Sequence, residues 1–276
     1  MTGDTIWRWN RTRSSSLGLL LAAISVAAAA ECSDRLNSLK VALVSDQSDW
    51  SEFDTSGRKL AQESGKLHGP ELSIALHCAD WDFLALASQL DGSRMYDGQT
   101  STGVTIISNS AVRQRQGYLQ ASFNLADSWR LGGRLSSNTI WRELASTGGA
   151  AGYPELYYWT TISLGTQWET VLGRNRFKLA AWFGKPVMST MELTLPGRDH
   201  ATLKLGSMNQ TEFAAGWRTP IGPSWYLEVD VQYRRTAIGQ GEDAVITRGG
   251  MPVAVAHQPQ TLLVDVPVAV RIGYDF

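Results

Sequence analysis

The chain has 276 residues, a formal net charge of −1 and 18% charged side chains. A net charge this close to zero argues against a nucleic-acid-binding protein, which usually carries an excess of basic residues. Two cysteines are too few for a disulfide-rich miniprotein or a zinc-ribbon protein. The length allows one large domain or two small ones.

Residues 1–30 have the pattern of a secretory signal peptide. Arg8, Arg11 and Arg13 precede an apolar run over residues 17–30, whose last residues before Glu31 are Ala28, Ala29 and Ala30. This run is too short to cross a bilayer as a helix, and it ends in an A-x-A cleavage pattern. We therefore predict a cleaved signal peptide at 1–30 and one mature domain at 31–276. A buried core helix is the alternative interpretation of the apolar run.

The rest of the chain alternates apolar and polar residues with a period of two. The clearest stretch places apolar side chains at every second position from Leu262 to Phe276. Such alternation is typical of strands with one apolar face, in a soluble sandwich or in a closed membrane barrel. We predict ten strands, with boundaries good to about three residues, at 38–50, 65–78, 81–94, 110–125, 129–143, 155–168, 176–187, 207–219, 224–236 and 261–276.

The links between these strands alternate in length. Short links fall at 79–80, 126–128, 169–175 and 220–223, and long ones at 51–64, 95–109, 144–154, 188–206 and 237–260. Short turns at one end and long loops at the other describe an all-β, antiparallel up-and-down transmembrane barrel with an even number of strands. The prediction is ten strands. Eight strands with an N-terminal extension is the alternative, because the first and third strands are the least regular.

Aromatic residues gather near the strand ends. One set lies near the short links, at Trp81, Trp129, Trp168, Phe177, Trp217 and Trp225, and another near the opposite ends, at Trp141, Tyr158 and Tyr233. Membrane interfaces favour such rings, so a membrane barrel is expected to carry two aromatic girdles about 25 Å apart. A soluble sandwich would bury more of these rings in mid-strand. The pattern therefore favours a membrane barrel.

The last six residues form a recognisable motif. Arg271, Gly273, Tyr274 and Phe276 follow the order polar, Gly, aromatic, aromatic, with Phe in the last position. This segment resembles the C-terminal signal that Gram-negative outer-membrane barrels present to their assembly machinery. The resemblance implies the barrel fold, the cell outer membrane as location and the barrel-assembly machinery as a partner. It implies no activity and no narrower family.

Ten strands also resemble the omptin proteases, whose aspartates and histidine act at the extracellular rim. Here only Asp199 and His200 lie in a suitable loop, and they are adjacent rather than spaced. No second pair of aspartates is evident. The omptin activity is therefore not carried over to this chain.

The two cysteines are expected to meet. Cys32 precedes the first predicted strand and Cys78 ends the second. Adjacent antiparallel strands would place both at the periplasmic rim, where a disulfide suits the oxidising compartment. A redox or metal role would need a CxxC-like spacing, which is absent.

The face opposite the apolar one carries charges of both signs. In contact with lipid each would cost ~2–4 kcal/mol, so we predict that they face the lumen. One antiparallel register satisfies both Glu228 with Arg271 and Arg234 with Asp265. The same register aligns Trp225 with Tyr274. His77 and Asp82 are likewise expected opposite each other across the short link at 79–80. Because small barrels are filled by their side chains, we predict a solid polar interior and no general porin. The inward charges are Glu71, His77, Asp82, Arg130, Arg134, Lys178, Glu228, Asp230, Arg234, Asp265 and Arg271.

Several polar residues in the predicted outer loops have no obvious structural role. The candidate binding residues are Arg94, Tyr96, Arg142, Tyr153 and Glu155, and the candidates for catalysis are His200, Asp199, Glu143 and Glu155. An acid, a base and a histidine at one rim could support hydrolysis of a peptide or an acyl ester. The simpler interpretation is that they link the loops and bind lipopolysaccharide or divalent ions. The histidines lack metal-ligand spacing, and no cofactor is predicted.

Three functions follow in order of preference. The first is a non-enzymatic envelope or surface-binding protein with a filled lumen, which acts through its extracellular loops on a ligand that the sequence does not identify. The second is an outer-membrane hydrolase of peptides or lipids, and the third is a narrow channel. The periplasmic turns are short, so we expect no pocket at that end and place any activity on the outer loops.

Overall fold

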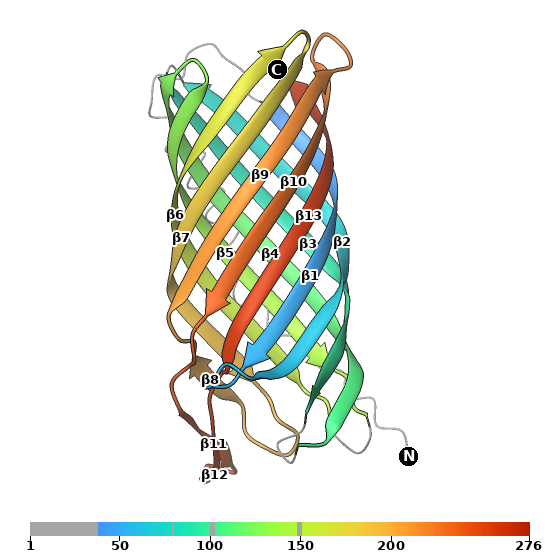
Figure 1. Cartoon of the computed structure of the whole chain (residues 1–276), viewed down its shortest axis with the longest axis vertical. Helices are drawn as coiled ribbons and strands as arrows, with labels where there is room; N and C mark the ends of the chain where they lie inside the picture. Colours follow the sequence, from blue (N-terminus) through green and yellow to red (C-terminus); the bar gives the residue numbers. More distant parts are fainter. Residues whose placement is uncertain (1–37, 79, 100–102, 148–150) are drawn as a thin grey trace.

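Ten long strands close into an antiparallel barrel in the computed structural model, which describes residues 38–78, 80–99, 103–147 and 151–276 (Figure 1). The predicted signal peptide and Cys32 lie outside the described residues. Within them, no helix has the length and hydropathy needed to cross a membrane. The barrel strands are β1 (Ser38–Phe53), β2 (Lys59–Cys78), β3 (Trp81–Gln99), β4 (Thr105–Ala126), β5 (Trp129–Leu144), β6 (Pro154–Leu172), β7 (Asn175–Leu193), β9 (Met208–Pro220), β10 (Trp225–Ile238) and β13 (Gln260–Asp275).

The strands follow one another around the barrel in chain order. Each pairs with its neighbours in the sequence, apart from the short extra strands described below, and β1 pairs with β13 to close the ring. The up-and-down topology with ten strands is confirmed. The alternative of eight strands is wrong, because β1 pairs along its whole length with both β2 and β13.

The two ends of the barrel differ as expected. At the turn end, uppermost in Figure 1, short turns connect the strands and the chain reaches its C-terminus. At the loop end the strands run further than predicted, and the long link expected at 51–64 shrinks to a turn over 54–58. Asp54 fastens this turn, because its carboxylate accepts hydrogen bonds from the backbone amides of Ser56 and Arg58, both at 2.9 Å.

The barrel is apolar outside and largely polar inside. A belt of exposed apolar side chains surrounds it, including Val41, Leu43, Leu72, Leu131, Leu135, Ile162, Leu164, Leu179, Phe183, Val231, Val268, Val270 and Ile272. Toward the loop end, the outer face of β2 to β4 becomes polar and exposes Lys66, His68, Asp91 and Arg113. These strands therefore continue past the apolar belt.

Aromatic rings mark the edge of the belt at the turn end. Trp129 and Trp225 are 49% and 50% exposed on the outer surface. Trp225 pairs with Tyr274 across the strands, as the register predicted, and their ring centroids are 5.0 Å apart. At the other edge Tyr233 is 41% exposed. The rings therefore occupy the outward positions that two girdles require.

Three short strands lie at the loop end. They are β8 (Ala201–Lys204), β11 (Ala244–Arg248) and β12 (Met251–Ala256), and the last two form a hairpin beyond the barrel (Figure 1). Leu203 and Ile246 from these loops are buried in one apolar cluster with inward strand residues such as Trp50 and Trp159. The prediction of an entirely polar interior is therefore wrong at this end, because the inward faces of the barrel strands carry apolar side chains here and β8 and β11 add more.

Candidate functional site

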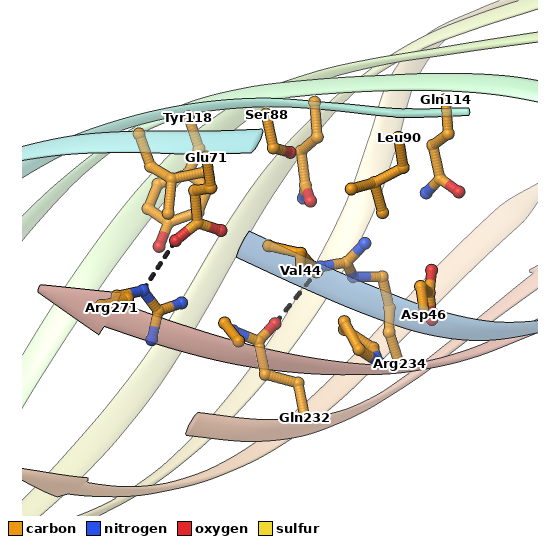
Figure 2. Close-up of a pocket in the computed structure, with 14 residues that line it drawn as sticks. Val44, Asp46, Glu71, Ser88, Leu90, Gln114, Tyr118, Gln232, Arg234 and Arg271 are labelled. Carbon is orange, nitrogen blue, oxygen red and sulfur yellow. Dashed lines mark hydrogen bonds and ion pairs between the residues drawn. The ribbon is translucent and has the colours of Figure 1, made fainter. Parts of the chain in front are cut away.

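The middle of the lumen is crossed by a network around Arg271. This guanidinium donates from Nε to Glu71 Oε1 at 2.7 Å and from Nη1 to Glu228 Oε1 at 3.1 Å. Lys40 Nζ contacts the other oxygen of Glu228 at 2.8 Å. Figure 2 shows Arg271 turned toward Glu71 beside Tyr118. The predicted register of Glu228 with Arg271 is confirmed, and the side chains of four strands meet here.

A second predicted pair has the right register but different partners. Arg234 lies directly across from Asp265, yet its Nε reaches Glu212 Oε2 at 3.4 Å. Asp265 instead accepts a hydrogen bond from Ser48 Oγ at 2.5 Å. No ion pair joins Arg234 to Asp265 among the described residues, so this predicted pairing is wrong. Glu212 on the neighbouring strand β9 offers Arg234 a carboxylate that it shares with Arg134, at 2.8 Å from Nη1.

Nearer the loop end, one arginine serves three carboxylates. Arg142 donates from Nε to Glu155 Oε2 at 2.7 Å, from Nη1 to Glu63 Oε1 at 3.0 Å and from Nη2 to Glu52 Oε1 at 3.1 Å. Its Cζ also lies 4.9 Å from the centre of the Trp50 ring. Arg142 and Glu155 are 2% and 4% exposed. Both were expected to act at the third outer loop, which they border, but their side chains on β5 and β6 point inward and close the lumen.

Arg94 is likewise a lumen residue. It is fully buried, donates from Nη2 to Ser48 Oγ at 2.6 Å and lies 3.8 Å from Glu63. Its Nε and Nη1 have no hydrogen-bond partner among the described residues. Asp46 Oδ1 and Asp265 Oδ2 are likewise buried without a hydrogen-bond partner there. Asp46 also lines a small cavity of about 20 Å³ in mid-lumen (Figure 2), close to the minimum volume that a single water needs.

The remaining candidates lie closer to the surface. Tyr96 and Tyr153 are half-buried, and Tyr153 packs against the apolar cluster at the loop end. Glu143 is exposed at an outward position of β5. The structure therefore does not bring Glu143 together with Glu155, whose side chain points into the lumen.

Asp199 fastens two outer loops together. Its carboxylate accepts hydrogen bonds from Thr247 Oγ1 at 2.6 Å and from the amides of Gly249 and Gly250 at 3.0 and 2.9 Å. Both glycines have positive φ, 58° and 79°, which turns their amides toward Asp199. These hydrogen bonds, that of Thr247 first, lower the pKa of Asp199 below its ordinary value. Asp199 thus holds the tip of the β11–β12 hairpin.

The outer histidines contact acids on open surface. His200 Nε2 lies 3.9 Å from Glu192 Oε2, and its Nδ1 lies 3.2 Å from Thr194 Oγ1. His257 Nδ1 lies 2.9 Å from Asp243 Oδ1. Their side chains are 55% and 42% exposed. Among the described residues, no three His, Cys, Asp or Glu side chains converge on a possible metal site.

A larger cavity opens at the turn end, where the sequence predicted no pocket. It has a volume of about 130 Å³ and is lined by inward side chains such as Lys40, Asp82, Arg130 and Lys178. The expectation that this end has no pocket is wrong, because side chains at the strand ends, and not the turns, form the walls of the cavity. Asp82 on β3 contacts its cross-strand partner His77 on β2, as predicted, and its other oxygen lies 2.6 Å from Arg130.

Comparison with known proteins supports the fold. The sequence matches no protein-family model and no curated protein. Among solved structures, the outer membrane protease OmpT from Escherichia coli is 12% identical with a TM-score of 0.53, over 87% of this chain and 97% of OmpT. The toluene transporter TbuX of Ralstonia pickettii and Neisserial surface protein A are each 10% identical with TM-scores of 0.37, covering 88% and 86% of this chain and 90% and 97% of their own. Likeness at this level concerns the fold alone, and this chain has the closed β-barrel fold of Gram-negative outer-membrane proteins.

Proposed function

We propose that this protein is a non-enzymatic barrel of the Gram-negative outer membrane, with a closed lumen and a binding surface at its loop end. In this proposal residues 1–30 are a cleaved signal peptide, the turn end faces the periplasm and Cys32 forms a disulfide with Cys78. The observation that carries the proposal is the lumen itself. Ion pairs around Arg142 and Arg271 and the apolar cluster fill the space that a channel would need.

The outer surface supports a place in a membrane. Exposed apolar side chains such as Leu43, Leu164 and Val270 would be unfavourable in water over so large an area. Aromatic rings at the belt edges and the motif ending in Phe276 agree with an outer-membrane barrel. The protein should therefore fractionate with the outer membrane and migrate differently in gels before and after boiling. Recovery of the full-length protein in the soluble periplasm would refute the proposal.

The closed lumen has its own test. Planar-bilayer recordings of the purified protein should show little or no conductance, because side chains of opposite charge meet across the lumen. The narrow-channel alternative predicts steady current through the same protein. Large, stable open channels would contradict the closed lumen while leaving the barrel fold intact.

We further propose lipopolysaccharide as a lipid partner, bound on the outer face rather than in the loops. The residues first expected to contact it, Arg142 and Glu155, are buried. The outer face of β4 instead exposes Arg113 and Arg115 beyond the apolar belt. Arg113 is the cross-strand partner of Trp141, a residue of the expected girdle at the loop end. Two arginines at this level would meet the phosphates of the outer leaflet.

The lipid proposal is tested with the double variant R113Q/R115Q in vesicles containing lipopolysaccharide. Its binding should be weaker than that of the parent protein, and the difference should shrink at high salt, because exposed charges are screened. Lys204→Gln is the matched control, because Lys204 is also an exposed cation but lies in β8 at the loop end. Equal binding by the double variant and the parent would refute the site.

The hydrolase alternative would rest on His200. A general base needs an acid or substrate proton within about 3.2 Å, in a site shielded from water. Glu192 lies 3.9 Å from His200, and both side chains are exposed. Both carboxylate oxygens of Asp199 accept hydrogen bonds from the β11–β12 hairpin. These observations favour binding over hydrolysis, and a peptidase or lipase activity that is lost in His200→Ala would reverse that preference.

A further inference from the structure

The cavity at the turn end, here called the vestibule, is open to solvent and has walls of charged side chains. Its volume of about 130 Å³ is roughly ten times what one water molecule needs. His77 and Arg176 lie at its rim with side chains 44% and 54% exposed. Deeper in the barrel, the network of Arg271 with Glu71 and Glu228 closes the passage. The vestibule is therefore a dead-end chamber.

Basic side chains outnumber acidic ones among the residues that line the vestibule. Four acidic and five basic side chains line it, namely Asp82, Glu169, Glu228 and Asp230 against Lys40, Arg130, Arg176, Lys178 and Arg218. Each acid already has a basic partner. Arg130 lies 2.6 Å from Asp82 and 2.9 Å from Glu169, Lys40 lies 2.8 Å from Glu228, and Arg271 lies 3.7 Å from Asp230.

Lys178 is the basic side chain left over. Among the described residues its Nζ makes no hydrogen bond and no ion pair within 4.0 Å. Its cross-strand neighbour on β6 is Glu169, which is engaged by Arg130 and by Arg176 at 3.4 Å. A cation held in a narrow chamber without a partner is unfavourable, and a bound anion would relieve that cost.

On the β9 side of Lys178 the wall of the vestibule is backbone and not a side chain. The neighbour of Lys178 on β9 is Gly216, which has no side chain to fill the space. A Cβ atom at Gly216 would approach Asp230 Oδ2 to 3.3 Å and Lys178 Cβ to 3.9 Å. Two residues away, Arg176 and Arg218 are direct cross-strand partners beside the same space. Glu169 lies 3.4 Å from Arg176 and Asp275 contacts Arg218, so both guanidinium groups have an acidic partner among the described residues, whereas Lys178 has none.

We infer that the vestibule is a binding site for a small phosphate-type oxyanion, held by Lys178. A lysine ammonium suits this role because it is a compact charge with three donors, which can reach different oxygens of a tetrahedral anion. Lys178 points into the lumen and not toward lipid. The source of the anion is therefore solution on the turn side, free phosphate or a soluble phosphomonoester, rather than a lipid headgroup. The site binds without conducting, because the Arg271 network closes the chamber.

The test is calorimetric titration of the full-length mature protein, folded in detergent, with inorganic phosphate. The parent protein should bind phosphate, and Lys178→Gln should lower the affinity at least tenfold. Lys204→Gln removes an exposed lysine at the opposite end of the barrel and should leave phosphate binding unchanged. Gly216→Ser keeps Lys178 but fills the space beside it, so this variant should also weaken phosphate binding.

Folding of each variant is checked by the gel shift between unheated and boiled samples. If Lys178→Gln does not fold, the phosphate affinity of Gly216→Ser is compared with that of the parent protein instead. Two results would overturn the inference. One is a folded parent protein that binds no phosphate, and the other is a folded Lys178→Gln or Gly216→Ser variant that binds phosphate as tightly as the parent. Either result would leave the closed-lumen proposal standing, because that rests on conductance.

Discussion

Arg271 and Glu228 are direct cross-strand partners on β13 and β10, but the guanidinium makes its shorter contact, 2.7 Å, with Glu71 on β2. Glu228 also has Lys40 at 2.8 Å, whereas no other cation within ion-pair distance serves Glu71 among the described residues. Glu228 is thus paired with Arg271, as the sequence predicts, but it also has a second cation. Glu71, 8% exposed, is the carboxylate that would be left without a partner.

The first prediction follows from this arrangement. Arg271→Met should destabilise the barrel by ~3–5 kcal/mol, the usual cost of removing one partner of a buried ion pair. The double variant E71L/R271M should be less destabilised, because no buried charge is left without its cation. Urea unfolding in detergent, followed by the fraction of protein in the folded gel band, measures both. A double variant less stable than Arg271→Met would contradict this account.

A second prediction compares two arginines on neighbouring strands. Arg142 lies in the lumen and contacts three carboxylates. Arg113 lies on the outer surface and contacts Asp91, and the side chains of this outer pair are 48% and 46% exposed. Arg142→Met should cost ~3–5 kcal/mol, whereas Arg113→Met should cost only ~0–1 kcal/mol. The same urea unfolding measures both variants. Similar losses for the two would show that the Arg142 cluster does not stabilise the lumen.

The fold and much of its register could be predicted from sequence because the apolar belt imposes a strict period of two. That period fixes which residues face lipid, and the pairs Glu228 with Arg271 and Trp225 with Tyr274 then fix the alignment of β10 with β13. Register alone does not decide which side chains touch. Arg234 lies opposite Asp265 and still turns to Glu212 on the other neighbouring strand.

The loop end could not be predicted in the same way. Past the belt, β2 to β4 meet water on the outside, so polar residues occupy the outer face and polar and apolar residues mix on the inner face, and the alternation is no longer clear. Arg94, Arg142 and Glu155 stand at the loop ends of their predicted strands, where the sequence does not show that their side chains face the lumen. Leu203 and Ile246 come from loops whose path over the mouth has no periodic signal. The turn-end vestibule was missed for a related reason, since turn length says nothing about space between strand ends.

The third prediction concerns pH and the outer hairpin. Hydrogen bonds from Thr247 and from the amides of Gly250 and Gly249 lower the pKa of Asp199 below its ordinary value of 3.8. A lowered pKa means that this carboxylate stabilises the docked hairpin fully above pH 3.8, and that the stabilisation is lost as pH falls through the lowered value. Hydrogen exchange of the amides in 244–256 should therefore show protection at neutral pH that weakens in strong acid.

Asp199→Asn should reduce that protection at neutral pH and remove its acid dependence. The matched control is Glu242→Gln, an exposed loop acid whose ion pair with Lys204, at 3.4 Å, does not involve the hairpin tip. This control should keep the parent profile. Unchanged protection in Asp199→Asn would show that packing of Ile246 alone docks the hairpin.

The last prediction concerns the two cysteines. Ser38 at the start of β1 pairs with Ala75, three residues before Cys78 on β2. Cys32 precedes Ser38 by six residues. A segment of this length can span up to about 20 Å, so it is long enough to reach Cys78. In the oxidising periplasm we expect the two to form a disulfide. Thiol labelling of denatured, unreduced mature protein should find no reactive cysteine, and labelling after reduction should find two. Cys32→Ser should expose one thiol without reduction, whereas two labelled thiols in the unreduced parent protein would show that the cysteines are not joined.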